Sequence, residues 1–376
     1  MSLQFTSLEY LILGSNRLEG PIPSLPNTLV ALDLSENSIA GPLPLIWNTP
    51  QLSNLLLSSN QINGSIPSYI CKLEVLEVLD LSNNSLSGEL PQCWNNSSLL
   101  VLDLSNNNLT SEIPSSIGSL SSLTLLHLNN NNFYGELPLE LQHCNNLVLL
   151  DLSNNELAGE IPTWIDENLQ DLVVLQLRSN MFVGEIPSEL ARLAYLQFLD
   201  LAHNNLTGSI PRSFGNFSAM IYHTIHNYDG KGFSVDEMMT YTAFDYNNNL
   251  LVVIHGEEYQ YSTTIYLLKI MDLSENNLSG QIPEEIVALA LLRKNCTENE
   301  TMPNVVGDNH PDGSESTWPY LGMGLGFVAG FWSACGILIF KKSWSSAYFQ
   351  MIDRLYDKIY VTIAIRMRRL NRNMQG

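Results

Sequence analysis

The feature that most constrains this chain is an internal repeat with a period of about 24 residues. Its unit reads L-x-x-L-x-L-x-x-N-x-L-x-G-x-I-P, and two of the fullest copies begin at Leu76 and Leu196. A unit this short cannot bury its own leucines, so successive units must stack as the coils of one solenoid with a shared core. Nine copies follow one another and a tenth follows an interruption, as shown by their repeated asparagines Asn16, Asn37, Asn60, Asn84, Asn107, Asn131, Asn155, Asn180, Asn204 and Asn276.

The pattern within one unit predicts how each coil folds. The L-x-L segment should be a short strand whose leucines point into the core, while the residues between them face the concave surface. The asparagine comes where the chain leaves the strand. Its side chain has both donors and an acceptor, so we expect it to bond backbone groups of its own coil and of the next coil. Losing one such asparagine should cost roughly 1–3 kcal/mol, because buried backbone groups lose their partners.

The second half of the unit, G-x-I-P, together with L-D-L-S-x-N, resembles the plant extracellular subclass of leucine-rich repeats. The resemblance covers residues 3 to about 290 and implies an α/β-type leucine-rich-repeat solenoid with short parallel strands on its concave face. It divides the chain into repeats one to nine over residues 1–216, an insertion over 217–266, and a last repeat with a partial coil over 267–292. The subclass occurs in receptor kinases, receptor-like proteins and secreted polygalacturonase inhibitors, so it does not fix a function.

Residues 217–266 interrupt the repeats and are rich in tyrosine and phenylalanine. Loops of this length are usually functional or disordered, and the aromatic content argues against disorder. We interpret the segment as a contact for a partner; an inert insertion or a decayed repeat is the alternative. Plant receptor-like proteins carry such an island before their last repeats, ending in Y-x8-K-G, and Tyr246, His255 and Gly256 match that ending with histidine in place of lysine. The resemblance implies that the island contacts ligand and a co-receptor kinase.

Residues 319–340 form a run of 22 residues without a charged side chain. That length is enough for one helix to cross a membrane. An acidic segment over 293–318 precedes it, and a tail over 341–376 with eight basic and two acidic residues follows, although the whole chain has a net charge of −21. The basic tail predicts that the C-terminus lies in the cytoplasm, as in a single-pass type I protein of the plasma membrane. The strongly negative remainder disfavours nucleic acid as a partner.

Small residues recur every four positions in this predicted membrane helix, at Gly322, Gly326, Gly330 and Ala334. Such a stripe lets another helix approach closely, although glycine is also common in membrane helices generally. The stretch from Tyr320 to Arg369 resembles the C-terminus of plant receptor-like proteins, which implies pairing with an adaptor leucine-rich-repeat receptor kinase. The tail has no glycine-rich loop and no HRD or DFG motif, so we expect no kinase, no other enzyme activity, no cofactor and no metal site.

The sequence also suggests covalent modification of an extracellular body. Cys71 and Cys93 occupy nearly equivalent places in adjacent coils, where they form either a disulfide or two free buried thiols. No leader precedes the first repeat and the cysteine-bearing cap of the family is not visible, which suggests a truncated chain. Acceptor motifs for N-glycosylation occur before the predicted membrane helix, at Asn63, Asn83, Asn95, Asn96, Asn108, Asn205, Asn216, Asn277, Asn295 and Asn299.

Most repeats place Asp and Ser between the strand leucines, as at Asp80 and Ser82. Repeats eight and nine depart from this, and we select the departures as candidate ligand contacts on an exposed strand face: Gln176, Arg178, Phe198 and His203. The leading hypothesis is a kinase-less cell-surface receptor that recognises an extracellular peptide, protein or glycan and signals through partner kinases in defence or development. The alternatives are a secreted-type binding or inhibitor module and a non-functional remnant of a receptor.

Overall fold

A computed structural model describes residues 7–46, 48–95, 98–221, 250–254, 257–261 and 269–286. All of these lie in the first of two compact units of the chain, Met1–Thr301. The tyrosine, histidine and glycine at Tyr246, His255 and Gly256 lie outside the described residues, as do residues 293–318, 319–340 and 341–376. Among the described residues, no helix has the length and apolar character needed to cross a membrane.

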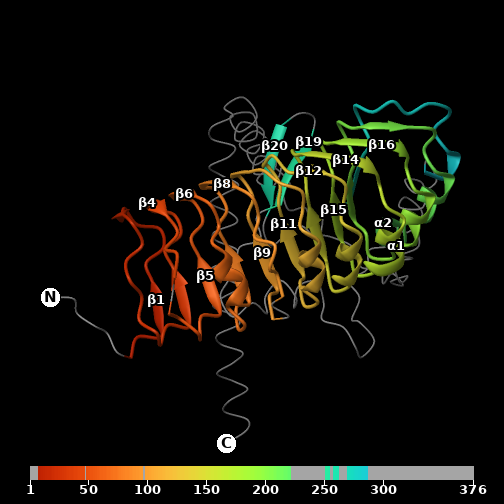
Figure 1. Ribbon diagram of the computed structural model, residues 1–376. Helices are drawn as coiled ribbons and strands as arrows, with labels where there is room; N and C mark the ends of the chain where they lie inside the picture. The colour runs from red at the N-terminus through yellow and green to blue at the C-terminus, as the bar shows by residue number, and fades with distance from the viewer. Residues whose placement is uncertain are drawn as a thin grey trace, which may run out of the picture. The chain divides into compact units, whose positions relative to one another are not determined.

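Each coil contributes one short strand to a ten-stranded parallel sheet, and the strands follow one another in the order of the repeats. Figure 1 shows these strands side by side from one coil to the next. The sequence therefore predicted the solenoid and the parallel arrangement of its strands correctly. The strands are β1 (Tyr10–Ile12), β3 (Ala31–Asp33), β5 (Asn54–Leu56), β7 (Val78–Asp80), β9 (Val101–Asp103), β11 (Leu125–His127), β13 (Leu149–Asp151), β15 (Val174–Gln176), β17 (Phe198–Asp200) and β21 (Ile270–Asp272).

The residues after nine of the ten repeated asparagines form further parallel strands on a lateral side of the coils, which the repeat pattern did not predict. A five-stranded sheet contains β2 (Glu19–Gly20), β4 (Ser38–Pro42), β6 (Gln61–Gly64), β8 (Ser85–Gly88) and β10 (Asn108–Leu109). A four-stranded sheet contains β12 (Tyr134–Gly135), β14 (Glu156–Glu160), β16 (Met181–Glu185) and β18 (Asn205–Thr207). The glycine of G-x-I-P has a positive φ in nine coils, for example +88° at Gly159, which explains why glycine recurs there.

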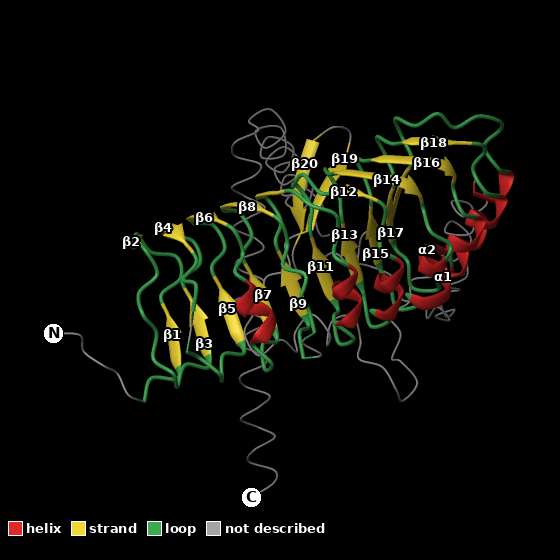
Figure 2. Ribbon diagram, viewed as in Figure 1, coloured by secondary structure: helices red, strands yellow, loops and turns green. Residues whose placement is uncertain are grey.

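The segments that return to the next strand are short and mostly 3-10 helical rather than α-helical. Figure 2 shows them gathered along one side of the coils, away from the lateral strands. Most begin directly after the proline of I-P, because proline lacks the N–H that a first helical turn leaves unpaired. They are η1 (Ser68–Lys72), η2 (Ser115–Ser119), η3 (Leu139–His143), η4 (Ser188–Arg192) and η5 (Arg212–Asn216), together with α1 (Trp164–Asn168) and α2 (Ser218–Ile221).

One continuous core runs through the stacked coils. The strand leucines, such as Leu79, Leu102 and Leu126, have no exposed surface. Each lies opposite its equivalents in the neighbouring strands, with Leu79 paired to Leu102 and Leu102 to Leu126. Stacking therefore buries leucines that a single coil would leave in water, as the repeat predicts.

The repeated asparagines form a hydrogen-bonded ladder along the core. The Nδ2 of Asn84 donates to the carbonyl oxygens of Leu81, Ser82 and, in the preceding coil, Leu57. Its Oδ1 accepts the Ile62 N–H of that same coil at 2.9 Å. The predicted structural role is confirmed, but the direction was wrong: from Asn37 onward, each side chain bonds the coil before its own and not the coil after it.

The tenth coil stacks directly on the ninth although about 50 residues are inserted between them. Strand β17 pairs with β21 in the ordinary register, Leu199 opposite Met271. The asparagine ladder also continues, because Asn276 donates to the Leu201 carbonyl at 2.9 Å. The insertion thus adds no strand to the ten-stranded sheet. Within it, β19 (Leu250–Ile254) and β20 (Glu257–Tyr261) form an antiparallel pair.

Candidate functional site on the concave face

The outward positions of the ten-stranded sheet form three parallel rows. The first row, one residue before the inner leucine, is apolar from the fourth coil onward and contains Val78, Val101, Leu125, Leu149, Val174, Phe198 and Ile270. The second row lies one residue after the inner leucine and contains Asp80, Asp103, His127, Asp151, Gln176, Asp200 and Asp272. The third row follows two residues later and contains Ser82, Ser105, Asn129, Ser153, Arg178, Ala202 and Ser274.

The apolar row is a packed cluster of its own, separate from the leucine core. Val101, Leu149 and Val174 have no exposed surface, and Phe198 has 1%. Because each side chain is flanked by its equivalents on adjacent strands about 4.8 Å away, the row is one continuous stripe along the sheet.

The recurrent Asp and Ser of the second and third rows bond each other within one coil. Asp80 Oδ1 accepts the Ser82 N–H at 3.0 Å and the Ser82 hydroxyl at 2.7 Å, and Asp151 does the same with Ser153. This local turn satisfies a carboxylate where the chain leaves the strand. The consensus Asp and Ser are therefore explained by structure and need no ligand.

Stacking places these carboxylates in line and changes their acidity. Burial, together with the neighbouring charge of Asp103, raises the pKa of Asp80 to about 7, although the bonds from Ser82 oppose the rise. Burial also raises the pKa of Asp151, and the nearby His127 lowers it in part. In the ninth coil, burial raises the pKa of Asp200 to about 6. Asp80, Asp151 and Asp200 therefore take up protons above the ordinary range of aspartate.

Coil eight replaces the Asp–Ser pair with Gln176 and Arg178. The Arg178 guanidinium instead donates to Asp272 Oδ2 at 2.8 Å, and its Nη1 lies 3.5 Å from Asp200 Oδ2. Burial alone would raise the pKa of Asp272, but bonds from Ser274 and Arg178 hold it below its ordinary value. One arginine thus joins coil eight to coils nine and ten.

The structure brings three of the four candidate ligand residues together but not on an exposed face. Gln176, Arg178 and Phe198 lie on adjacent concave rows with 2%, 9% and 1% of their surface exposed. The expectation of exposure is therefore wrong for these residues. Phe198 belongs to the apolar row, and is no departure from the Asp–Ser pattern.

His203 occupies a different place from the other three. It is exposed and has a φ of +53°, like Asn83, Asn106 and Asn154 in their coils. The third-row residue of coil nine is Ala202, whose N–H bonds Asp200 at 3.0 Å. The prediction that His203 occupies the third row was wrong by one residue. His203 lies at the left-handed turn between the strand and the repeated asparagine.

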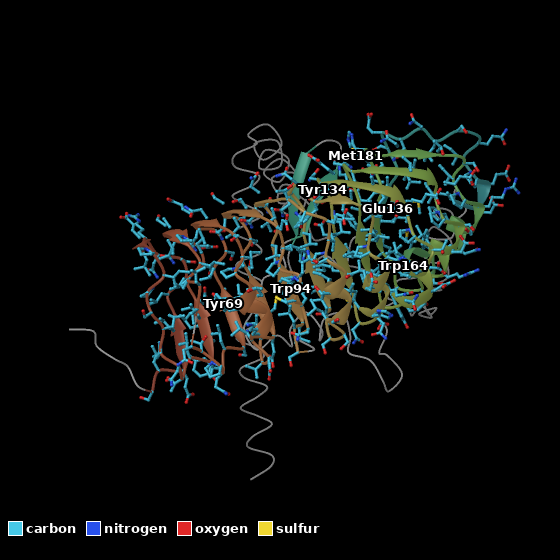
Figure 3. All side chains as sticks on the ribbon, viewed as in Figure 1. Tyr69, Trp94, Tyr134, Glu136, Trp164 and Met181 are labelled. Carbon is cyan, nitrogen blue, oxygen red and sulfur yellow. A yellow bond between two sulfur atoms is a disulfide. The ribbon has the colours of Figure 1, made fainter. Side chains whose placement is uncertain are left out.

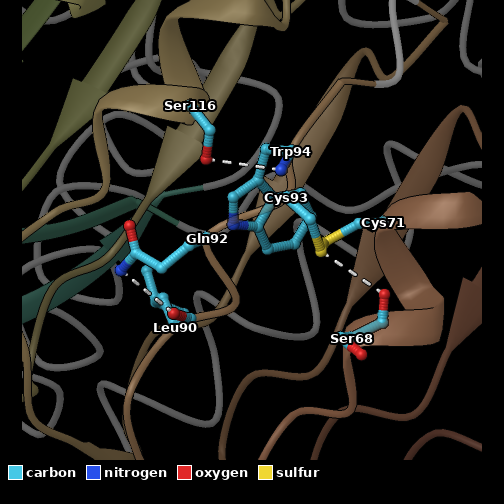
Figure 4. Close-up of a disulfide and its surroundings, with 7 residues drawn as sticks. All are labelled: Ser68, Cys71, Leu90, Gln92, Cys93, Trp94 and Ser116. Atoms are coloured by element: carbon cyan, nitrogen blue, oxygen red, sulfur yellow. Dashed lines mark hydrogen bonds between the residues drawn. A yellow bond between two sulfur atoms is a disulfide. The ribbon is translucent and has the colours of Figure 1, made fainter.

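The cysteines and the sequons can also be located. Cys71 and Cys93 form a disulfide with their Cα atoms 5.6 Å apart, beside the buried Trp94 (Figure 4). Cys144 is a buried free thiol whose pKa is raised to about 12 by burial. The sequon asparagines that the structure describes are all exposed: Asn63, Asn83, Asn95, Asn108, Asn205, Asn216 and Asn277; Asn96, Asn295 and Asn299 lie outside the described residues.

Comparison with known proteins identifies the family. Segments 7–29, 51–73, 75–97, 98–120, 122–144, 146–168, 195–217 and 267–289 match the Leucine Rich Repeat family. A region of 72 residues is 38% identical to Receptor-like protein 48 of Arabidopsis thaliana, covering 18% of this chain and 8% of that protein. The chain is a leucine-rich-repeat protein and is similar to plant receptor-like proteins.

Two solved structures resemble this chain. The plant peptide hormone receptor RGFR1 in complex with RGF2 has a TM-score of 0.55 and 38% identity, over 56% of this chain and 34% of that chain. The Arabidopsis receptor kinase HAESA, in complex with the peptide hormone IDA and the co-receptor SERK1, has a TM-score of 0.51 and 28% identity, over 75% of this chain and 48% of that chain. The matched regions thus span less than half the length of each of these proteins.

Proposed function

We propose that this receptor-like protein recognises an extended extracellular peptide along the concave face of its solenoid. The observation that carries the proposal is the set of three rows, apolar, acidic and small polar, which continue in register across seven coils. An extended peptide presents side chains with its own fixed repeat, so a regular series of rows can read several of them at once. Solved structures of similar ectodomains contain peptide hormones.

Gln176 and Arg178 are the positions at which we expect recognition to be most selective. They interrupt the Asp–Ser series, and Arg178 is the one basic residue in the third row among the described coils. A ligand carboxylate would compete with Asp272 for the guanidinium. Phe198 would contribute apolar contact, and His203 would act from the turn at the edge of the same coil. Because the first three have little exposed surface, ligand entry would require the side chains around them to move.

We further propose that signalling passes through partner kinases rather than through an enzyme in this chain. The island ending at Tyr246, His255 and Gly256 would contact a co-receptor kinase; a co-receptor, SERK1, is present in the HAESA structure. The predicted membrane helix, with Gly322, Gly326, Gly330 and Ala334, would pair with an adaptor receptor kinase. The ectodomain would then lie outside the plasma membrane and the basic tail inside.

The test uses the full chain with a supplied leader, expressed in plant cells and labelled at the surface. An array of synthetic plant peptide hormones that includes RGF2 and IDA is the probe. We expect at least one peptide to bind, and Gln176→Ala or Arg178→Gln to weaken its binding at least tenfold. Glu156→Gln, a neutralising change on the lateral strand β14, is the matched control and should leave binding unchanged.

Two results would contradict the proposal. Surface-exposed, correctly glycosylated chain that binds no peptide of the array would argue against a peptide receptor. Binding that survives both concave substitutions unchanged would move the site away from the concave face. Co-purification of kinases with the wild-type chain, and its loss when Gly322, Gly326 and Gly330 are replaced together by leucine, tests the partner part separately.

A further inference from the structure

The lateral side of the solenoid contains a hollow of about 850 Å³ that has no part in the concave site. It lies over the fourth, fifth and sixth coils, where the two lateral sheets meet. The side chains that give it its chemical character are Glu89, Gln92, Glu112, Tyr134, Glu136 and Leu139. Figure 3 shows Tyr134 and Glu136 beside the lateral strands.

The sequence explains why the hollow forms here. Coil five has Ser111 where the other nine coils have a glycine with positive φ, and Ser111 does not adopt that conformation. The lateral sheet is interrupted between β10 and β12. Only two backbone bonds cross the gap, from Asn132 to Leu109 and from Tyr134 to Ser111.

The carboxylates around the hollow are held in place by the glycines of the following coil. The side chain of Glu112 lies across Gly135, with its Cγ 3.0 Å from where a Cβ would be. Glu136 lies across Gly159 in the same way, at 2.8 Å. A larger residue at either glycine would displace the glutamate beside it, so glycine leaves the room in which each stem lies.

These negative charges are not neutralised within the described part of the chain. All four ion pairs found there involve other residues, and none includes Glu89, Glu112 or Glu136. The carboxylates are also not gathered as a metal site, because no group of three or more potential metal ligands is found among the described residues. A ligand that neutralises them must therefore bring separate positive charges along the coils.

The same hollow exposes apolar surface. Tyr134 is 46% exposed and Leu139 is 59% exposed, whereas most large apolar side chains of these coils are buried. An aromatic ring beside carboxylates suits a guanidinium or an ammonium group, which is attracted by the ring face and by the negative charge together. Leu139 supplies a contact for the aliphatic stem of such a side chain or for an apolar neighbour.

We propose that this lateral hollow docks an extended segment of another protein that bears arginine or lysine side chains. Neighbouring coils are about 4.8 Å apart, so carboxylates from three coils extend over about 10 Å. An extended segment spans that distance with about three residues. Its basic side chains pair with Glu89, Glu112 and Glu136, and one of them stacks on Tyr134. The site is independent of the concave face, so a basic partner and a concave ligand bind at the same time.

The experiment measures binding of a fluorescein-labelled synthetic peptide of alternating arginine and serine to the full chain in detergent. Glu112→Gln combined with Glu136→Gln removes two charges with little change of shape. We expect at least a tenfold weaker affinity for this pair, and a similar loss for Tyr134→Ala. Glu160→Gln combined with Glu185→Gln is the matched control, because it removes two equivalent charges from later coils outside the hollow, and it should change affinity less than twofold.

A second measurement locates the contact directly. Carbodiimide joins a carboxylate to a peptide amine, so with the lysine analogue of the peptide we expect cross-links at Glu112 and Glu136 but not at Glu160 and Glu185. Because sequons at Asn95 and Asn108 lie between lining residues Gln92 and Ser111 in sequence, both measurements are made before and after enzymatic removal of N-glycans. Equal weakening by both glutamine pairs, or cross-links spread evenly over all four glutamates, would show diffuse attraction to an acidic protein and would overturn the proposal. Binding to neither glycoform would do the same.

Discussion

At the scale of single residues, the repeat specifies which side chains are structural. The asparagines and inward leucines could be assigned from spacing alone, because each has one role that recurs in every coil. The positions of the four candidate ligand residues on the concave face could not be assigned from spacing alone. A shift of one residue separates Ala202 from His203, and only the backbone shows which of them takes the left-handed turn. The burial of Gln176 and Phe198 could not be predicted either, since it depends on the three-dimensional packing and not on the spacing within one repeat.

The asparagine ladder gives a stability prediction. Asn84→Ala removes three donated bonds and one accepted bond, which leaves backbone groups of two coils without partners. We expect the free energy of unfolding to fall by about 1–3 kcal/mol. Gln61→Ala, at the equivalent exposed position after Asn60, should change it by less than about 0.5 kcal/mol. Urea unfolding monitored by circular dichroism makes the comparison, and equal midpoints for the two variants would contradict the structural role.

The acidic row predicts how stability depends on pH. The pKa of Asp80 is about 7 in the folded chain, well above its ordinary value of 3.8. Between these values the folded state binds more protons than the unfolded state, so stability falls as pH rises from about 4 to about 7. Asp80→Asn retains an acceptor for Ser82 and cannot ionise. It should flatten this slope and raise stability at neutral pH by at least about 1.4 kcal/mol, the equivalent of one pKa unit.

Asp272→Asn provides the comparison of opposite sign. The pKa of Asp272 is lowered in the folded chain, so its charge contributes stability above the ordinary pKa and that stability is lost as pH falls through the folded value. Asp272→Asn should therefore destabilise the protein at neutral pH. Thermal unfolding between pH 4 and pH 8 measures both variants. Parallel profiles for Asp80→Asn and the wild type would show that Asp80 ionises normally.

At the scale of elements, the sequence predicted the concave strands but missed the lateral ones. Both belong to the same repeat, yet the concave strand shows alternating leucines, whereas a lateral strand such as β12 or β10 has only two residues and carries no periodic signal of its own. Its pairing partner is the next coil, not a neighbour in sequence. The turns on the opposite side are too short to show the spacing of apolar residues that marks a helix. Their 3-10 character could therefore not be predicted from the sequence.

The packing of these turns predicts a severe effect at one glycine. Gly118 lies in η2, and an added Cβ would come within 2.1 Å of the Glu140 backbone oxygen in η3. The new Cβ would collide with backbone atoms, which cannot move aside as a flexible side chain can. Gly118→Ala should therefore destabilise the solenoid by about 1–3 kcal/mol or more. Ser119→Ala, at the exposed next residue of η2, is the control. A stable Gly118→Ala variant with unchanged melting temperature would show that the two turns are not in tight contact.

At the scale of the whole molecule, the described coils form one continuous stack across the insertion. The sequence indicated where the repeats stop and resume, but it could not show that coil ten returns to the register of coil nine. Arg178 links coil ten to the coils before the insertion, because its guanidinium in coil eight forms an ion pair with Asp272 in coil ten. Its place between two carboxylates could not be foreseen, since Asp272 is 94 residues away in sequence.

This bridge predicts a local effect far along the chain. Arg178→Ala leaves the buried Asp200 without its cation and removes one link to β21. We expect at least tenfold faster hydrogen exchange at the amides of Ile270–Asp272, while the first coils are unchanged. Arg192→Ala, which breaks the ion pair with Asp166 on the opposite side of the coils, is the control and should leave β21 unaffected. Unchanged exchange in β21 after loss of Arg178 would return this arginine to a purely ligand-binding role.

The orientation of the chain is the prediction that involves all its parts. Asn63, Asn205 and Asn277 are exposed on the lateral side of the solenoid, so a translocated solenoid offers them to the glycosylation machinery. With a leader supplied in a microsomal translation system, we expect glycosylation at these positions and a basic tail that added protease removes. Each Asn→Gln substitution should abolish one glycan, and Asn145→Gln, at an exposed asparagine outside any sequon, should abolish none. Because the acidic solenoid and the basic tail favour opposite sides of a membrane, a full-length, unglycosylated product with a protected tail would contradict the proposed topology and the receptor function that depends on it.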